Sequence, residues 1–389
     1  MLLVALLAAP LAGLAGPVGA AGAAAGTPGP AGSTIGGPEL ASRGVVVPTH
    51  ARPLPRNLTA RGWVLADLDT GGVLAARDAH GRYPPASTLK TLTALTLLPR
   101  LTDRRQLVTC TDADARIEGS RVGLVPHGRY TVDVLFQALL LMSGNDAANA
   151  LARAAGGVPQ TVALMNAEAV RLQAYDTHAA TPSGLDGPGQ ATSAYDLALI
   201  ARAGLHRADF SRYVAQRAGM LPRVSAKYPE FHISNQNRLL YNYAGAFGVK
   251  TGFTDAARHT FVGAAARHGR RLVVTFLHGE RRPIDVWQQA AALLDWGFAL
   301  PRGTPPVGRL VAPADPGAPG GAGAGSAEAT ATTATAAPRA TTIGAPSRLP
   351  VLPLVGGVGL VTALAGAGTV VLRRRRRTPR LPGFRERRR

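Results

Sequence analysis

Alternating apolar and polar positions near both ends of one long stretch predict two β-hairpins. In GWVLADLDTGGVLAARD, residues 62–78, two short apolar runs flank a DTGG turn signal. Residues 259–279, HTFVGAAARHGRRLVVTFLHG, alternate in the same way on either side of an HG pair. Most of the stretch between the hairpins has the apolar period of helices. Strands at both ends and helices between them predict an α+β domain, with an antiparallel sheet assembled from both of its ends.

Three apolar periods define the main predicted helices. Pro84 and Pro85 disfavour helix before them, and a helical period begins at Ser87. The segment YTVDVLFQALLLM, which begins at Tyr130, is a strongly apolar helix with Thr131 as its N-cap. A last helix, DVWQQAAALLDWGFAL, closes the folded unit.

Both ends of the chain are apolar. Residues 1–25 resemble the hydrophobic region and small-residue cleavage zone of a secretory signal, although the usual basic residues before it are missing. Residues 351–372 are 22 uncharged residues, and a helix of that length measures roughly 33 Å, enough to cross a bilayer. Five arginines follow directly, and the positive-inside rule places them in the cytoplasm. We therefore expect a cell-membrane protein with an extracellular folded domain and a cytoplasmic tail.

Segments rich in proline, glycine and alanine join the apolar ends to the folded unit. They have no apolar period and cannot bury enough surface to fold. The predicted organisation is a signal peptide at 1–25, a flexible arm at 26–60, a folded domain at 61–301, a linker at 302–348, a transmembrane helix at 351–372 and a basic tail at 373–389.

Much of the net positive charge of the chain lies in its C-terminal tail. The net charge is +20, but the last 17 residues hold ten arginines and one glutamate and so carry +9 of it. The remainder is modestly basic and has no aromatic residues interleaved with basic ones, so we expect no nucleic-acid partner. Cys110 is the one cysteine in the sequence, which rules out an intrachain disulfide and a cysteine-based metal cluster.

The segment PPASTLKTLTAL, residues 84–95, contains a candidate nucleophile and base. Ser87 and Lys90 are three residues apart at the beginning of a predicted helix, so their side chains share a face. The positive end of a helix disfavours the ammonium form of a lysine, as a neighbouring cation also would. A neutral lysine can accept the proton of a serine hydroxyl. This spacing alone is a weak signal, because it arises by chance in most chains of this length.

Two further motifs strengthen the interpretation. LMSGNDAANALA places Ser143 and Asn145 where the long apolar helix ends, and GVKTGFTD places a Lys-Thr-Gly motif on a late strand. Motifs of the types S-x-x-K, S-D-N and K-T-G are together the signature of penicillin-binding proteins and class A β-lactamases. With its flanking segments, the chain most closely resembles the D-alanyl-D-alanine carboxypeptidases over residues 62–298.

The resemblance implies a β-lactamase/penicillin-binding-protein-like fold, with an antiparallel sheet flanked by helices and an inserted helical subdomain. It implies a serine hydrolase that removes the terminal D-alanine of peptidoglycan stem peptides through an acyl-enzyme. It further implies inactivation by β-lactams and no cofactor or metal. The expected partners are therefore a stem peptide ending in D-Ala-D-Ala, β-lactam inhibitors and, through the C-terminal helix, the membrane.

The resemblance also assigns roles to residues of the three motifs. In catalysis, Ser87 is the nucleophile, Lys90 its base, Ser143 passes the proton towards the leaving group, and Asn145 binds the substrate backbone.

The K-T-G motif and the residue after it are expected to bind substrate. Lys250 and Thr251 face its terminal carboxylate, Gly252 leaves room for it, and the N–H groups of Phe253 and Ser87 form the oxyanion hole. The following Arg258 and His259 stand where the family tends to have a glycine and a small residue, which is expected to alter the substrate groove more than the chemistry.

Three alternatives remain open. A β-lactamase needs a carboxylate base, usually in an E-x-x-L-N segment, and residues 146–249 contain no such segment. A DD-transpeptidase or endopeptidase would use the same scaffold, and the motifs do not separate these from a carboxypeptidase. A non-catalytic wall-binding receptor would have no need of Lys90, so the intact motifs argue against it.

Overall fold

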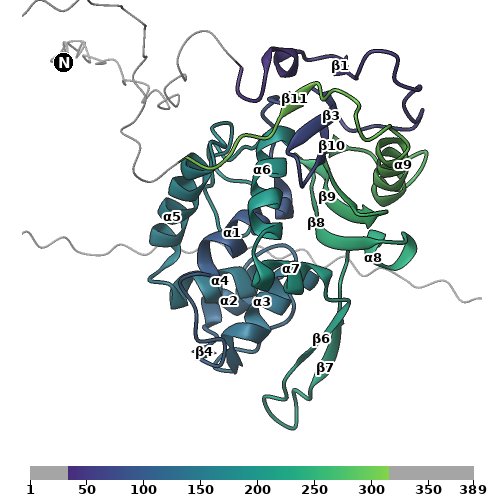
Figure 1. The fold of residues 1–389 in the computed structure, drawn as a ribbon. Coiled ribbons are helices and arrows are strands. Elements are labelled where there is room, and N and C mark those ends of the chain that lie inside the picture. The colour runs from purple at the N-terminus through teal and green to yellow at the C-terminus, as the bar shows by residue number, and fades with distance from the viewer. Residues whose placement is uncertain (1–33, 315–389) are drawn as a thin grey trace, which may run out of the picture. The chain divides into compact units, whose positions relative to one another are not determined.

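The computed structural model describes residues 34–314, which fold around one central antiparallel sheet (Figure 1). Its α+β architecture is the predicted one. The predicted signal peptide, transmembrane helix and basic tail lie outside the described residues. Within residues 34–314, no helix combines the length and apolar character needed to cross a membrane.

The central sheet is assembled from both ends of the described chain, as predicted. Its strands follow the order β1-β3-β2-β10-β9-β8, with β11 paired to β3, and every pairing is antiparallel. Both predicted hairpins form, and the pairing of β2 with β10 joins them. The strands are β1 (Val45–Val46), β2 (Gly62–Asp67), β3 (Gly72–Arg77), β8 (Ala246–Thr254), β9 (Arg258–Arg267), β10 (Arg270–Gly279) and β11 (Gly308–Arg309).

Helices cover both faces of the sheet, and the central strands supply residues alternately to two cores. On β2, Val64 and Ala66 belong to the core that includes α6, whereas Trp63 and Leu65 belong to the core that includes α9. This alternation follows from the two-residue period of a strand. It explains why β2 and β10 are apolar on both faces: in each strand the middle residues are fully buried.

The helical region is inserted between β3 and β8. Thr131 caps α3 as predicted, because its hydroxyl accepts the Val134 N–H at 3.2 Å. Two small hairpins, β4–β5 and β6–β7, complete this part. The helices are α1 (Lys90–Leu97), α2 (Asp112–Arg116), α3 (Val132–Leu141), α4 (Asn145–Ala154), α5 (Val158–Arg171), α6 (Ala194–Leu205), α7 (Ala208–Ala215), α8 (Leu239–Asn242) and α9 (Val286–Phe298). The small hairpins are β4 (Leu107–Thr109) with β5 (Arg129–Thr131) and β6 (Ala218–Leu221) with β7 (Phe231–Ser234).

The folded domain is longer at both ends than its sequence predicts. Residues 34–60, expected to be a flexible arm, form the 3-10 helix η1 (Pro38–Ala41) and strand β1, and Leu40 is buried. Residues 302–314, expected to belong to the linker, include β11 and a buried Leu310. Isolated apolar side chains that pack one at a time leave no periodic signal, so both segments were assigned wrongly.

Candidate active site

Ser87 lies on a tight turn that the surrounding structure holds in place. The 3-10 helix η2 (Ala86–Leu89) begins with Ala86 at φ 47°, a left-handed conformation that is unusual for a residue with a side chain. The Pro85 carbonyl before it accepts hydrogen bonds from the hydroxyls of Thr88, at 2.6 Å, and Thr260, at 2.8 Å. Because Thr260 lies on β9, these bonds fix the turn against the sheet. The α-helix itself begins at Lys90, one turn later than predicted.

The Lys90 amine contacts three oxygens in a fully buried position. Its Nζ lies 3.0 Å from Ser87 Oγ, 2.7 Å from Asn145 Oδ1 and 2.5 Å from the Ser183 carbonyl oxygen. The last two oxygens can only accept, whereas the Ser87 hydroxyl can donate. A neutral amine therefore fits the arrangement, with two N–H groups on the fixed acceptors and its lone pair towards the serine.

The electrostatics favour the same neutral form. Burial lowers the pKa of Lys90 well below its usual range, the positive charge of Lys250 lowers it further, and Asp146 opposes the shift. Lys250 is also fully buried, and burial lowers its own pKa to about 7. Its Nζ donates to the Thr251 carbonyl at 2.8 Å.

Ser143 and Asn145 occupy the junction between α3 and α4, as the sequence predicts. Asn145 is held on both sides, since its Nδ2 donates to the Glu118 carbonyl at 2.7 Å while its Oδ1 faces Lys90. Ser143 is 3% exposed and has φ 63°. Its Oγ has no hydrogen-bond partner among the described residues. A buried hydroxyl without a partner is destabilising, and Ser143 is not among the residues that line the two clefts beside β8.

Strand β8 runs directly against the Ser87 turn. A Cβ atom added to Gly252 would lie 2.7 Å from the Ser87 nitrogen and 2.4 Å from Thr260 Oγ1, so this position requires glycine. The next residue, Phe253, is 48% exposed and stacks on His259 with ring centroids 4.6 Å apart. The backbone of β8 at Gly252 therefore lies close to the backbone nitrogen of Ser87.

Two clefts open beside this strand. One, of about 370 Å³, is lined by Ser87, Asn145 and Phe253 together with acidic side chains that include Glu118. The other, of about 170 Å³, is lined by Thr251, Gly252 and His259 and by the cations Arg238 and Arg281.

The structure thus brings residues of all three predicted motifs together. It also adds the backbone carbonyl of Ser183, a residue that lies outside the three motifs. The Ser183 carbonyl accepts a hydrogen bond from Lys90 Nζ. Because every residue has a backbone carbonyl, the residue type does not predict this contact.

A family profile described as D-alanyl-D-alanine carboxypeptidase matches residues 48–280. The chain belongs to this family. It is a serine-type D-Ala-D-Ala carboxypeptidase, as the motifs indicate. The D-alanyl-D-alanine carboxypeptidase DacB2 of Mycobacterium tuberculosis is 49% identical over 260 residues, which cover 66% of this chain and 87% of DacB2. DacD of Salmonella typhimurium is 35% identical over 258 residues, but the match covers only 64% of DacD.

Solved structures agree with the family assignment. The crystal structure of the M. tuberculosis D-alanyl-D-alanine carboxypeptidase matches with a TM-score of 0.64 at 48% identity, over 68% of this chain and 99% of that one. A mutant of a Streptomyces DD-transpeptidase matches with a TM-score of 0.60 at 29% identity, over 63% of this chain and 100% of that one. The same fold therefore also occurs in an enzyme whose name describes transpeptidation and not hydrolysis.

Proposed function

We propose that this carboxypeptidase removes the terminal D-alanine of peptidoglycan stem peptides through an ester on Ser87. The observation that carries the proposal is the position of the Lys90 amine, 3.0 Å from Ser87 Oγ. The amine is buried, and burial lowers its pKa and so favours its neutral form. Ser87 Oγ attacks the carbonyl carbon of the penultimate D-alanine while its proton passes to Lys90. The C–N bond then breaks, and D-alanine leaves after its nitrogen receives a proton by way of Ser143. Water hydrolyses the ester and restores Ser87.

Backbone and cationic groups stabilise the charges of this reaction. The N–H groups of Ser87 and Phe253 face the developing oxyanion. The terminal carboxylate of the substrate lies towards Thr251 and Lys250. Arg238 and Arg281 of the smaller cleft both pair with Asp285 and together leave a net positive charge on that side. β-Lactams acylate the same serine, because they present an equivalent carbonyl and carboxylate.

Penicillin labelling tests the assignment of Ser87. In Ser87→Ala, fluorescent penicillin labelling and D-alanine release from a pentapeptide should both fall to background, because the hydroxyl that forms the ester is removed. Ser225→Ala changes an exposed serine in the loop between β6 and β7 and is the matched control, which should label like the parent. Labelling of Ser87→Ala at the parental rate would show that another residue is acylated.

A transferase activity on the same site is the second candidate, favoured by the structural likeness to the Streptomyces DD-transpeptidase. Both reactions share the acyl-enzyme and differ in the acceptor that attacks it. Incubation with a pentapeptide and an added amino-acid acceptor separates them. A carboxypeptidase should release D-alanine at the same rate with and without the acceptor and form little transfer product.

We further propose that residues 351–372 anchor the enzyme in the cell membrane, with the catalytic domain outside and residues 373–389 in the cytoplasm. The support is the uncharged run of 22 residues followed by an arginine block. Replacing the five arginines that begin at 373 by neutral residues should weaken retention or orientation in the membrane, measured by protease protection, while activity in detergent is unchanged.

A further inference from the structure

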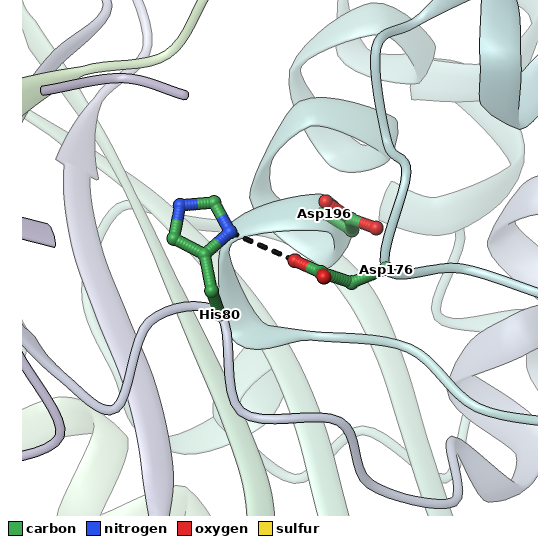
Figure 2. A group of neighbouring side chains, drawn as sticks. All are labelled: His80, Asp176 and Asp196. Carbon is green, nitrogen blue, oxygen red and sulfur yellow. Dashed lines mark hydrogen bonds and ion pairs between the residues drawn. The ribbon is translucent and has the colours of Figure 1, made fainter. Parts of the chain in front are cut away.

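Away from the active site, three potential metal ligands converge from three separate segments. His80 follows β3, Asp176 follows α5, and Asp196 lies in the first turn of α6 (Figure 2). One ligand atom from each lies within 4.8 Å of the other two, and His80 Nδ1 is 2.8 Å from Asp176 Oδ2. We propose that this cluster binds one divalent transition-metal ion of the zinc type, through His80 Nδ1 and one carboxylate oxygen from each aspartate.

The orientation of His80 suits a metal ligand. Its Nε2 lies 3.0 Å from the Ile35 carbonyl oxygen, which can only accept a hydrogen bond, so Nε2 carries the proton. Nδ1 lies 2.8 Å from Asp176 Oδ2, which also only accepts, so without an ion Nδ1 donates its own proton to the carboxylate. A metal ion would displace this proton and meet the Nδ1 lone pair on the side of the carboxylates. Metal-binding histidines commonly donate their other N–H to a backbone carbonyl or a carboxylate, which fixes the ring in this way.

Asp196 is also held by an outer partner. The hydroxyl of Thr177 donates to Asp196 Oδ2 at 2.7 Å, and Asp196 is 1% exposed. Fixed hydrogen bonds to ligating carboxylates are a second regular feature of metal sites. Two of the three ligands therefore have the supporting contacts that a metal site requires, and these come from different segments of the chain.

The charge and chemistry of the cluster fit a divalent ion. Two carboxylates beside a neutral imidazole balance a charge of +2. One nitrogen and two oxygens are donors that zinc accepts, with a fourth position left for water. His80 and Asp176 keep side-chain exposures of 22% and 25%, so an ion can enter from solvent while Asp196 forms the buried end of the site.

The position of the cluster indicates a structural role for the ion. Asp176 and Asp196 lie at the two ends of the loop that carries Ser183, whose carbonyl contacts Lys90. Tyr83 and Thr192 already join this loop to the segment before Ser87 through paired backbone hydrogen bonds of 2.9 Å. No residue of the cluster lines the Ser87 cleft. The ion would thus hold the two ends of this loop together without contacting the substrate.

Metal titration of the full chain tests the proposal independently of catalysis. The protein is purified without a polyhistidine tag, stripped with a chelator and titrated with Co²⁺, whose visible spectrum reports its coordination, and Zn²⁺ is then added as competitor. The parent should bind one equivalent in a saturable manner. His80→Gln and Asp176→Asn should each weaken binding at least about tenfold, and Zn²⁺ should raise the thermal midpoint of the parent far more than that of either variant.

His127 supplies the matched control, because it faces a single carboxylate, Asp112, at 3.6 Å on the exposed surface. His127→Gln should bind Co²⁺ like the parent. Circular dichroism shows whether each variant is folded, and Asp196→Asn adds a test of the buried ligand. A parent without a saturable site, or His80→Gln and Asp176→Asn variants that are folded and bind as tightly as the parent, would overturn the proposal.

Discussion

Lys250 should make the folded enzyme less stable at neutral pH, and its replacement by methionine should reveal by how much. Burial lowers the pKa of this amine from 10.5 to about 7. Between these two values the unfolded chain binds the proton more tightly than the folded one, so stability rises with pH across this window. Below about pH 7 the penalty is fully present. The shifted pKa of Lys250 therefore lowers the free energy of unfolding by about 4 kcal/mol at pH 7 and by about 2 kcal/mol at pH 9.

Methionine removes this penalty along with the hydrogen bond from Nζ to the Thr251 carbonyl. The lost hydrogen bond offsets about 1 kcal/mol or somewhat more of the gain, but equally at both pH values. The informative quantity is therefore the difference in unfolding free energy between Lys250→Met and the parent, compared at pH 7 and pH 9. We expect the gain in unfolding free energy of the variant over the parent to be about 2 kcal/mol larger at pH 7 than at pH 9. Activity should be lost at pH 7, because the variant lacks the positive charge that the parent partly retains beside Lys90 at this pH.

Urea denaturation followed by tryptophan fluorescence, in one detergent buffer at each pH, measures these free energies. Lys227→Met is the matched control, since Lys227 is exposed in the loop between β6 and β7, and its difference from the parent should not depend on pH. The same Lys250→Met difference at pH 7 and pH 9 would refute the reasoning, because it would mean that Lys250 titrates alike in the folded and unfolded states.

Three further predictions follow from the site and the domain boundaries. Lys90→Arg should slow penicillin acylation about 10²–10⁴-fold, because a guanidinium stays protonated and cannot act as the base; stopped-flow labelling near the parental rate would show that Lys90 acts only as a charge. Gly252→Ala should slow acylation about 10²-fold with the fold retained, because the new Cβ displaces the Ser87 backbone; unchanged kinetics would place β8 further from Ser87. A chain ended after Leu300 lacks β11 and should melt at a lower temperature than one ended after Ala314, and equal melting temperatures would show that β11 adds no stability.

The sequence predicted those parts of the fold in which a local pattern repeats. The β2–β3 and β9–β10 hairpins alternate along their whole length, and α3 is apolar over several turns and capped by Thr131. The segments at 34–60 and 302–314 were missed because each contributes single buried side chains, such as Leu40 and Leu310, to a core built by other elements.

The site was predictable where chemistry depends on residue type, and not where it depends on position alone. Ser87 and Lys90 are recognisable when their spacing is combined with the two other motifs, because the reaction needs those side chains. Ser183 acts through its carbonyl, which any residue could supply. His80 and Asp196 are far apart in the sequence, and only the paths of β3, α5 and α6 bring them near each other.

Some of the unfavourable features of the described residues lie in the motifs around Ser87, although left-handed non-glycine residues such as His50 and His127 also occur elsewhere. Ala86 and Ser143 adopt left-handed backbone conformations, and the Ser143 hydroxyl is buried without a partner among the described residues. Lys90 and Lys250 are fully buried amines; burial lowers the pKa of both, and the charge of Lys250 lowers the pKa of Lys90 further. Strain of this kind persists only where the surrounding structure enforces it. A substitution that relieves one of these features should therefore stabilise the fold and impair acylation together.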